Sequence, residues 1–70
     1  MTTGRIKWFN QMQSFGYITL ADGSEVYFHC TGLKQIDLMS ILGPGQNVSF
    51  DLIHTRSGIE AHNVDLLEWR

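Results

Sequence analysis

Two short segments in which aromatic rings alternate with other side chains constrain this chain more than any other feature. Residues 15–18 read Phe-Gly-Tyr-Ile, and residues 26–29 read Val-Tyr-Phe-His. Because side chains of an extended strand point to opposite faces in turn, each segment places two flat rings on one face. These rings are Phe15 and Tyr17, then Tyr27 and His29. Nucleobases stack on such platforms, and a glycine between two rings leaves room for close approach, so the pattern predicts an exposed binding surface.

The length of the chain limits what this surface belongs to. The 70 residues form one small domain, which buries only about 60% of the surface of its extended chain. We therefore expect a single domain over residues 1–70, without an enclosed enzyme pocket, catalytic residues or a cofactor. Binding is the expected use of the aromatic surface.

Cysteine content and hydrophobic runs indicate the compartment. The single cysteine, Cys30, excludes an internal disulfide. The chain has no uncharged apolar run of about 18 residues and no basic-then-apolar leader at Met1. We therefore expect a cytoplasmic protein that does not contact a membrane.

The net charge of −2 restricts the kind of nucleic acid that this chain can bind. Tight, salt-driven binding to a duplex needs many Lys and Arg side chains that displace counterions, and this chain has five. If nucleic acid binds here, stacking must contribute much of the affinity.

Alternation and turn residues predict three consecutive strands in the first part of the chain. They cover residues 5–10, 15–20 and 25–29, and Asp22-Gly23 between the last two is a hairpin signal. Simple alternation in the first strand places Trp8 with Ile6. Trp8 therefore faces the core unless this strand twists or bulges.

The second part contains a long connection and two more strands. Residues 31–45 have no clean period although they are rich in apolar side chains, and we expect Leu33 to plug one end of the core. Residues 46–54 alternate apolar and polar positions, and residues 59–67 follow as a fifth strand. The apolar positions of this last strand change parity, which predicts a bulge.

Five strands with a long connection after the third favour a small all-β barrel. In order and at nearly the family's spacing, the sequence resembles a cold-shock domain. The blocks that carry the resemblance cover almost the whole chain and are Lys7-Trp8-Phe9-Asn10, Ser14-Phe15-Gly16-Tyr17-Ile18, Val26-Tyr27-Phe28-His29, Gly45-Gln46-Asn47-Val48-Ser49-Phe50 and Ala61-His62-Asn63-Val64. The resemblance implies a five-stranded antiparallel OB-fold β-barrel with a long loop between strands 3 and 4. It also implies binding of single-stranded RNA and DNA with little sequence specificity, often as an RNA chaperone that influences transcription or translation.

The resemblance also assigns residues to the nucleic-acid site by position. The implied stacking side chains are Trp8, Phe15, Tyr17, Tyr27 and His29, with Phe9 at the margin and Lys7 beside the phosphates. Each base stacked on an aromatic ring is worth roughly 1–3 kcal/mol, so several stacks support micromolar binding. Arg5 and Arg56 would add local positive potential that the net charge hides.

Several positions depart from the family pattern. Gln13 and Ser14 stand where Lys-Gly usually precedes the first motif, which removes a phosphate-contacting charge and a permissive glycine. Cys30 stands where an aromatic ring commonly follows the histidine of the second motif, and Leu38 or Met39 replaces another ring in the long loop. We therefore expect weaker binding, or a shorter footprint, than in a typical member.

An interaction module is the alternative function. The apolar side chains of the loop 33–42, if exposed together, would form a patch that docks on another protein or on a second copy. A three-strand unit joined to a two-strand unit by a long loop can also exchange halves between chains. A monomer and a domain-swapped homodimer are therefore both open at this point.

Each candidate residue also has a purely structural interpretation. Trp8, Phe15 and Tyr17 can instead pack in a core, and His29 can be an ordinary surface histidine. The three histidines and Cys30 lack the spacing of a zinc site, so we expect no bound metal. Cys30 is expected to be a small packed thiol rather than a nucleophile, because no pattern supplies a base for it.

Overall fold

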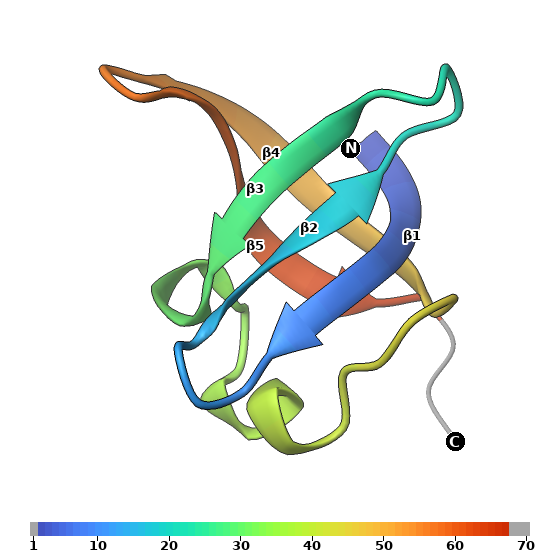
Figure 1. The fold of residues 1–70 in the computed structure, drawn as a ribbon, viewed down its shortest axis with the longest axis vertical. Helices are drawn as coiled ribbons and strands as arrows, with labels where there is room; N and C mark the ends of the chain where they lie inside the picture. Colours follow the sequence, from blue (N-terminus) through green and yellow to red (C-terminus); the bar gives the residue numbers. More distant parts are fainter. Residues whose placement is uncertain (1, 68–70) are drawn as a thin grey trace.

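The computed structural model describes residues 2–67, and the strands within this range form one closed barrel (Figure 1). The strands are β1 (Thr2–Asn10), β2 (Phe15–Thr19), β3 (Glu25–His29), β4 (Asn47–Thr55) and β5 (Gly58–Leu66). Two short 3-10 helices, η1 (Cys30–Gly32) and η2 (Ile36–Ser40), lie in the connection between β3 and β4. The expected all-β barrel with a long loop between the third and fourth strands is confirmed.

The strand order around the barrel is β1-β2-β3-β5-β4. Antiparallel pairs join β1 to β2, β1 to β4, β2 to β3 and β4 to β5. The contact between β3 and β5 is parallel and has the register pair Tyr27 and Glu60. This parallel contact, which the sequence analysis did not anticipate, closes the sheet on itself and brings β5 beside the aromatic segments.

Alternation along the strands fills the barrel with apolar side chains. In β2 and β3 the even-numbered residues are buried, among them Ile18 and Phe28. The complete buried cluster is Ile6, Ile18, Val26, Phe28, Leu38, Leu42, Val48, Phe50, Ala61 and Val64. The odd-numbered side chains of β2 and β3 are therefore left on the outer face.

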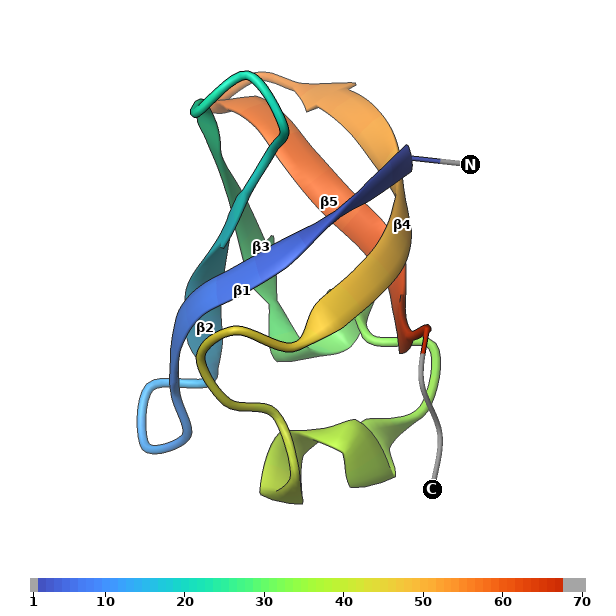
Figure 2. The ribbon, with the colours of Figure 1, turned by 90° about the vertical axis from the view of Figure 1, so that its right-hand side faces the viewer.

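The connection between β3 and β4 covers one end of the barrel, as Figure 2 shows. Leu38 of η2 is 0% exposed and Leu42 is 8% exposed, so both belong to the core. Leu33 packs against the same core and bridges to Val64, which confirms its expected place at one end.

Only some of the apolar side chains in residues 33–42 are exposed, which bears on the alternative function as an interaction module. Ile36 and Ile41 are 63% and 47% exposed, but Leu38 and Leu42 point into the barrel. A patch over residues 33–42, on which the alternative function depends, would therefore lack Leu38 and Leu42. A small barrel needs apolar side chains from its longest loop to cover an open end.

The bulge that the sequence predicted in the last strand is present. Ser49 and Asp51 of β4 face Asp65 and His62 of β5, so two steps along β4 match three along β5. Asn63 lies at this shift with a φ of 55°, in the left-handed region. Asn tolerates this region better than most residues, which locates the extra residue of the bulge.

The hairpin predicted at Asp22-Gly23 is also present. Asp22 Oδ1 accepts hydrogen bonds from the backbone N–H of Ser24 at 2.9 Å and from the Ser24 hydroxyl at 2.6 Å. Gly23 has a φ of 90°, which glycine adopts without steric cost. The Ser24 hydroxyl, followed by the Ser24 backbone N–H, holds the pKa of the Asp22 carboxyl below its ordinary value.

Candidate nucleic-acid interface

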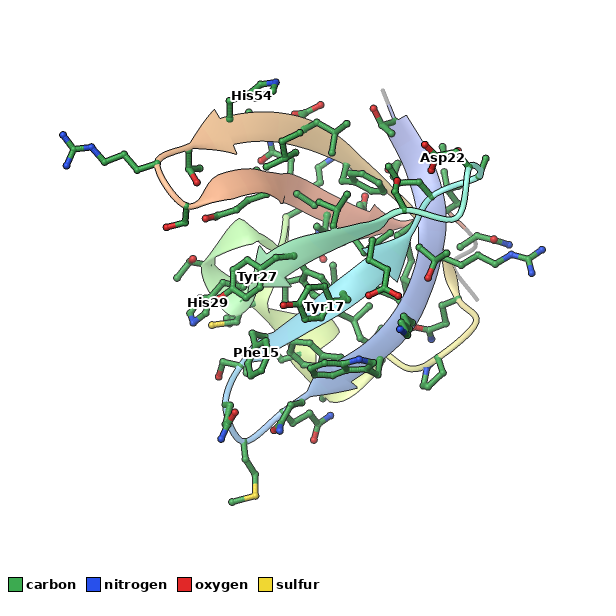
Figure 3. All side chains as sticks on the ribbon, turned by 45° about the horizontal axis from the view of Figure 1, so that its top comes forward. Phe15, Tyr17, Asp22, Tyr27, His29 and His54 are labelled. Atoms are coloured by element: carbon green, nitrogen blue, oxygen red, sulfur yellow. The ribbon has the colours of Figure 1, made fainter. Side chains whose placement is uncertain are left out.

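Aromatic side chains form a row across the outer face of three neighbouring strands. Trp8 of β1 lies opposite Tyr17 of β2, and Tyr17 lies opposite Tyr27 of β3. Phe15 and His29 form the neighbouring register pair on the same face of β2 and β3. In Figure 3 the labelled side chains of Phe15, Tyr17, Tyr27 and His29 lie together on one side of these strands. We call Trp8, Phe15, Tyr17 and Tyr27 the aromatic face.

The four rings of the aromatic face touch one another and remain partly exposed. Ring centroids are 5.3 Å apart for Trp8 and Phe15, and 5.4 Å apart for Trp8 and Tyr17. Tyr27 lies 5.9 Å from Phe15 and 5.9 Å from Tyr17. Edge and offset contacts of this kind are worth about 0.5–1.5 kcal/mol each beyond burial. The rings therefore fix one another in a platform before any ligand binds.

A bulge in β1 decides that Trp8 joins this platform. The register of β1 against β2 shifts between Ile6 and Trp8. Ile6 is buried in the core, whereas Trp8 lies on the outer face against Phe15 and Tyr17. Without the extra residue, strict alternation would put both side chains on the same side. Trp8 was expected to face the core unless the first strand bulges, and the structure contains this bulge.

Gly16 serves the packing of the barrel interior. It was expected to leave room for a base, but it is buried and faces the barrel interior. A Cβ at this position would lie 2.3 Å from the carbonyl oxygen of Trp8 and 3.0 Å from the ring of Phe28. Glycine is needed here because β1 and the Phe28 ring both approach the backbone closely.

Phe9 is not brought to the aromatic face. Its ring stacks on Phe28 of the core, with centroids 5.5 Å apart and an interplanar angle of 13°. Phe9 is partly buried and packs against the core cluster. The resemblance implied that Phe9 lies at the margin of the site. In the structure Phe9 lies on the inner side of β1 and packs against Phe28.

His29 lies at the end of β3, beside Phe15 in the register. Its Nδ1 accepts the backbone N–H of Thr31 at 3.3 Å and lies 3.2 Å from the Thr31 hydroxyl. Cys30 Sγ is 3.6 Å from the same nitrogen. These contacts fix the ring at the start of η1 and leave Nε2 as the nitrogen that can meet a ligand.

The two basic side chains assigned to the phosphates, Lys7 and Arg56, lie in different surroundings. Lys7 forms an ion pair with Glu25, which shares the outer face of β3 with Tyr27. Arg56 lies in the exposed turn between β4 and β5. Because Lys7 already has an acidic partner, its charge adds less to phosphate attraction than the sequence analysis expected.

The departures from the family pattern have structural correlates. Ser14 has a φ of 64°, a left-handed conformation in which the family's glycine costs nothing. Cys30 is half-buried at the start of η1, and Leu38 is fully buried. Met39 is half-buried, and its carbonyl oxygen accepts a hydrogen bond from Gln11 at 2.7 Å. Neither Leu38 nor Met39 adds a ring to the aromatic face.

Strand β5 contributes to the surroundings of the aromatic face, which was not predicted from the sequence. A cleft of about 360 Å³ lies beside the aromatic face, lined by Tyr17, Tyr27, Ser57, Ile59 and Glu60. Glu60 reaches this position through the parallel contact of β5 with β3. No local pattern carries that information, because residues 27 and 60 become neighbours only when the barrel closes.

Other kinds of site have little support within residues 2–67. No group of three or more His, Cys, Asp or Glu side chains in this range is placed to hold a metal ion. Figure 3 shows His54 far from His29. In the described part of the chain, no helix has the length and apolar character needed to cross a membrane.

A closed five-stranded barrel with an exposed aromatic platform defines a class of small binding protein, and comparison with known proteins identifies the family. Residues 2–67 match the model of the 'Cold-shock' DNA-binding domain. The chain therefore belongs to the cold-shock domain family, whose members bind nucleic acid and are not enzymes.

Curated relatives agree over nearly their whole length. The chain is 41% identical to cold shock-like protein CspC of Bacillus cereus over 61 residues, which cover 87% of this chain and 92% of the relative. It is 38% identical to cold shock protein CspD of Bacillus subtilis over 64 residues, covering 91% and 96%. It is 42% identical to cold shock-like protein CspC of Shigella flexneri over 62 residues, covering 87% and 88%.

Proposed function

We propose that this protein is a single cold-shock domain that binds single-stranded RNA and DNA through the aromatic face and acts as an RNA chaperone in the cytoplasm. The observation that carries the proposal is the contact of four partly exposed rings on one outer face, with centroids 5.3 to 6.5 Å apart. Bases of a duplex are stacked on one another, so this face accepts only unpaired ones.

The chaperone activity follows from mass action. A protein that binds the open strand and not the hairpin shifts the equilibrium toward the open strand, without ATP. Loosening of messenger RNA structure would then influence transcription and translation. In this account Trp8, Phe15, Tyr17 and Tyr27 stack bases, His29 flanks them, and Lys7 and Arg56 meet phosphates.

The alternative, an interaction module built on residues 33–42, has less support. Leu38 and Leu42 belong to the core, which leaves Ile36 and Ile41 as the strongly exposed apolar side chains within residues 33–42. We therefore propose that the protein acts as a monomer, and the Ile36→Ala variant below tests this as well.

A fluorescence titration with heptathymidine tests the proposed function. In a Trp69→Phe background Trp8 is the only tryptophan, so quenching reports on the aromatic face. The wild-type face should show saturable quenching, and Phe15→Ala should weaken binding by about 1–3 kcal/mol, since one stacking ring is lost. Ile36→Ala is the matched control, because it removes an exposed apolar side chain elsewhere.

Salt sensitivity adds a second readout to the same titration. Each neutralised phosphate of a single strand contributes about −0.7 to the slope of log K against log salt, so contacts from Lys7 and Arg56 give a slope no steeper than about −1.4. Absence of quenching in the folded wild-type protein, or equal losses in Phe15→Ala and Ile36→Ala, would contradict the proposal. Self-association that Ile36→Ala abolishes would favour the interaction module instead.

A further inference from the structure

Glu60 occupies the end of the aromatic row. The register places Tyr17 opposite Tyr27 and Tyr27 opposite Glu60, and partners in a register point to the same face. The row that begins at Trp8 therefore runs through two tyrosines and ends in a carboxylate. Figure 3 shows the two tyrosines side by side on β2 and β3.

Glu60 lines a cleft that is large enough to admit a base. Tyr17, Tyr27 and Glu60 line one cleft of about 360 Å³, together with Ser57 and Ile59 of the β4–β5 turn region. A base that stacks on Tyr27 within this cleft has its edge toward β5. Glu60 is therefore the acidic side chain that such an edge meets.

The carboxylate keeps acceptor capacity for a ligand. Its Oε2 lies 3.3 Å from the Thr55 hydroxyl, but that hydroxyl has one proton and donates it to the carbonyl oxygen of Gly58 at 2.8 Å. Its Oε1 lies 3.4 Å from His62 Nε2, and Glu60 remains partly exposed. A carboxylate accepts about four hydrogen bonds, so these contacts leave room for base donors.

Base chemistry then discriminates among the possible ligands. Guanine presents two adjacent donors, N1–H and the N2 amino group, which match the two oxygens of a carboxylate. Adenine and cytosine present one amino group beside an acceptor nitrogen, and thymine and uracil present one N–H between two carbonyl oxygens that a carboxylate repels. An acceptor-only side chain therefore favours guanine and disfavours thymine and uracil.

We propose that Glu60 makes the cleft beside Tyr27 a guanine-selective base site. This inference rests on the proposed function, since it assigns a preference to one position of the same face. It departs from the low sequence specificity that the family resemblance implied. The charge of Glu60 repels the phosphates of every strand, whatever its sequence, so its contribution to base selection appears in the ratio of two affinities.

The test compares heptathymidine with seven oligonucleotides that each carry one deoxyguanosine in place of a thymidine. Binding is measured by isothermal titration calorimetry, because guanine quenches fluorescent probes and would distort an optical readout. The best single-guanine strand should bind the wild-type chain about tenfold more tightly than heptathymidine, as expected for a bidentate pair. In Glu60→Gln this ratio should fall to within about twofold, because the amide keeps one acceptor and gains donors.

Asp65→Asn is the matched control for charge. It removes the same charge from β5 at a residue that pairs with Lys34 and lies away from the aromatic face, so the guanine ratio should stay at its wild-type value. Circular dichroism and thermal melting confirm that each variant is folded. A wild-type preference that persists in Glu60→Gln, or heptathymidine binding without any gain from guanine, would overturn the inference and leave the proposed function intact. Binding of none of the strands would instead overturn the proposed function and this inference with it.

Discussion

At the scale of residues, the backbone conformation of Ser14 and the pKa of Asp22 can both be tested by substitution. Ser14 is the clearest case of strain, because its φ of 64° lies in the left-handed region. Its backbone is held there by two hydrogen bonds, from its N–H to Asn10 at 2.7 Å and from the N–H of Cys30 to its carbonyl oxygen at 2.8 Å. The turn before the aromatic face is therefore built with a residue that does not favour its conformation.

Replacing this serine tests the strain directly. Ser14→Gly should raise the free energy of unfolding by about 1 kcal/mol, since glycine adopts positive φ without steric cost. Urea denaturation monitored by circular dichroism measures the change. Ser49→Gly in β4 is the control and should be destabilising, because glycine weakens a strand interior. A Ser14→Gly protein that is less stable than wild type would show that the turn is not strained.

The turn around Asp22 lowers the pKa of its carboxyl group. The Ser24 hydroxyl and then the Ser24 N–H lower the pKa of Asp22, so the ionised form is favoured in the folded protein. A depressed folded-state pKa gives a stability contribution that is complete above the ordinary carboxyl pKa and is lost as the pH falls through the folded value.

Carboxyl titration by NMR measures this shift. The Asp22 midpoint should lie below the ordinary value in the wild type and should move upward in Ser24→Ala, which removes the side-chain donor but keeps the backbone one. Acid unfolding of Ser24→Ala should accordingly depend slightly less on pH in this range. Identical midpoints in the two proteins would rule out the hydroxyl as the cause.

At the scale of elements, the connection between β3 and β4 serves as a cover for the barrel. Two helical turns place Leu38 at 0% exposure, while Ile36 of the same turn region is 63% exposed. The two side chains are both branched aliphatics of equal size, so they differ mainly in burial. Substitutions at Leu38 and Ile36 can therefore distinguish a structural role of the loop from a role in docking.

Leu38→Ala should lower the free energy of unfolding by about 2–5 kcal/mol, because it removes buried methyl groups and leaves a cavity under the loop. Ile36→Ala should change it by no more than about 0.5 kcal/mol, as is usual for an exposed site. Equilibrium denaturation of both variants makes the comparison. Similar losses in the two variants would mean that Leu38 does not cover the core as described.

The strands could be predicted from sequence because their information is local. Alternation placed Phe15, Tyr17, Tyr27 and His29 on one face, and Asp22-Gly23 located the hairpin between them. The loop was harder, since apolar residues without a period read equally as exposed surface or as cover. Burial there depends on the open end of a barrel that only the complete chain forms.

At the scale of the whole molecule, the site depends on closure. Trp8 enters the aromatic face through a bulge that alternation alone left undecided, and the resemblance placed Phe9 at a margin that the structure assigns to the inner side. Glu60 could not be predicted at all, because it meets Tyr27 across a parallel contact between distant segments. Some residues of the candidate site thus follow from local alternation, whereas others are positioned only by the closed barrel.

The charges around the aromatic face bear on the proposed binding of single strands. The aromatic face is assembled from three strands, while Lys7 is paired with Glu25 and β5 contributes the carboxylate of Glu60. Because Lys7 is paired and Glu60 adds a negative charge, stacking would be the main source of affinity at this face. A duplex, whose bases are already stacked, gains little from it.

The most direct test of this account is a residue-by-residue map of where heptathymidine binds. In ¹H–¹⁵N and aromatic NMR spectra recorded during a titration, the largest shift changes should fall on Trp8, Phe15, Tyr17 and Tyr27 and on the cleft beside Glu60. Residues 33–42 should change little. Shift changes confined to residues 33–42, or spread evenly over the barrel, would contradict the assignment of the aromatic face as the binding site.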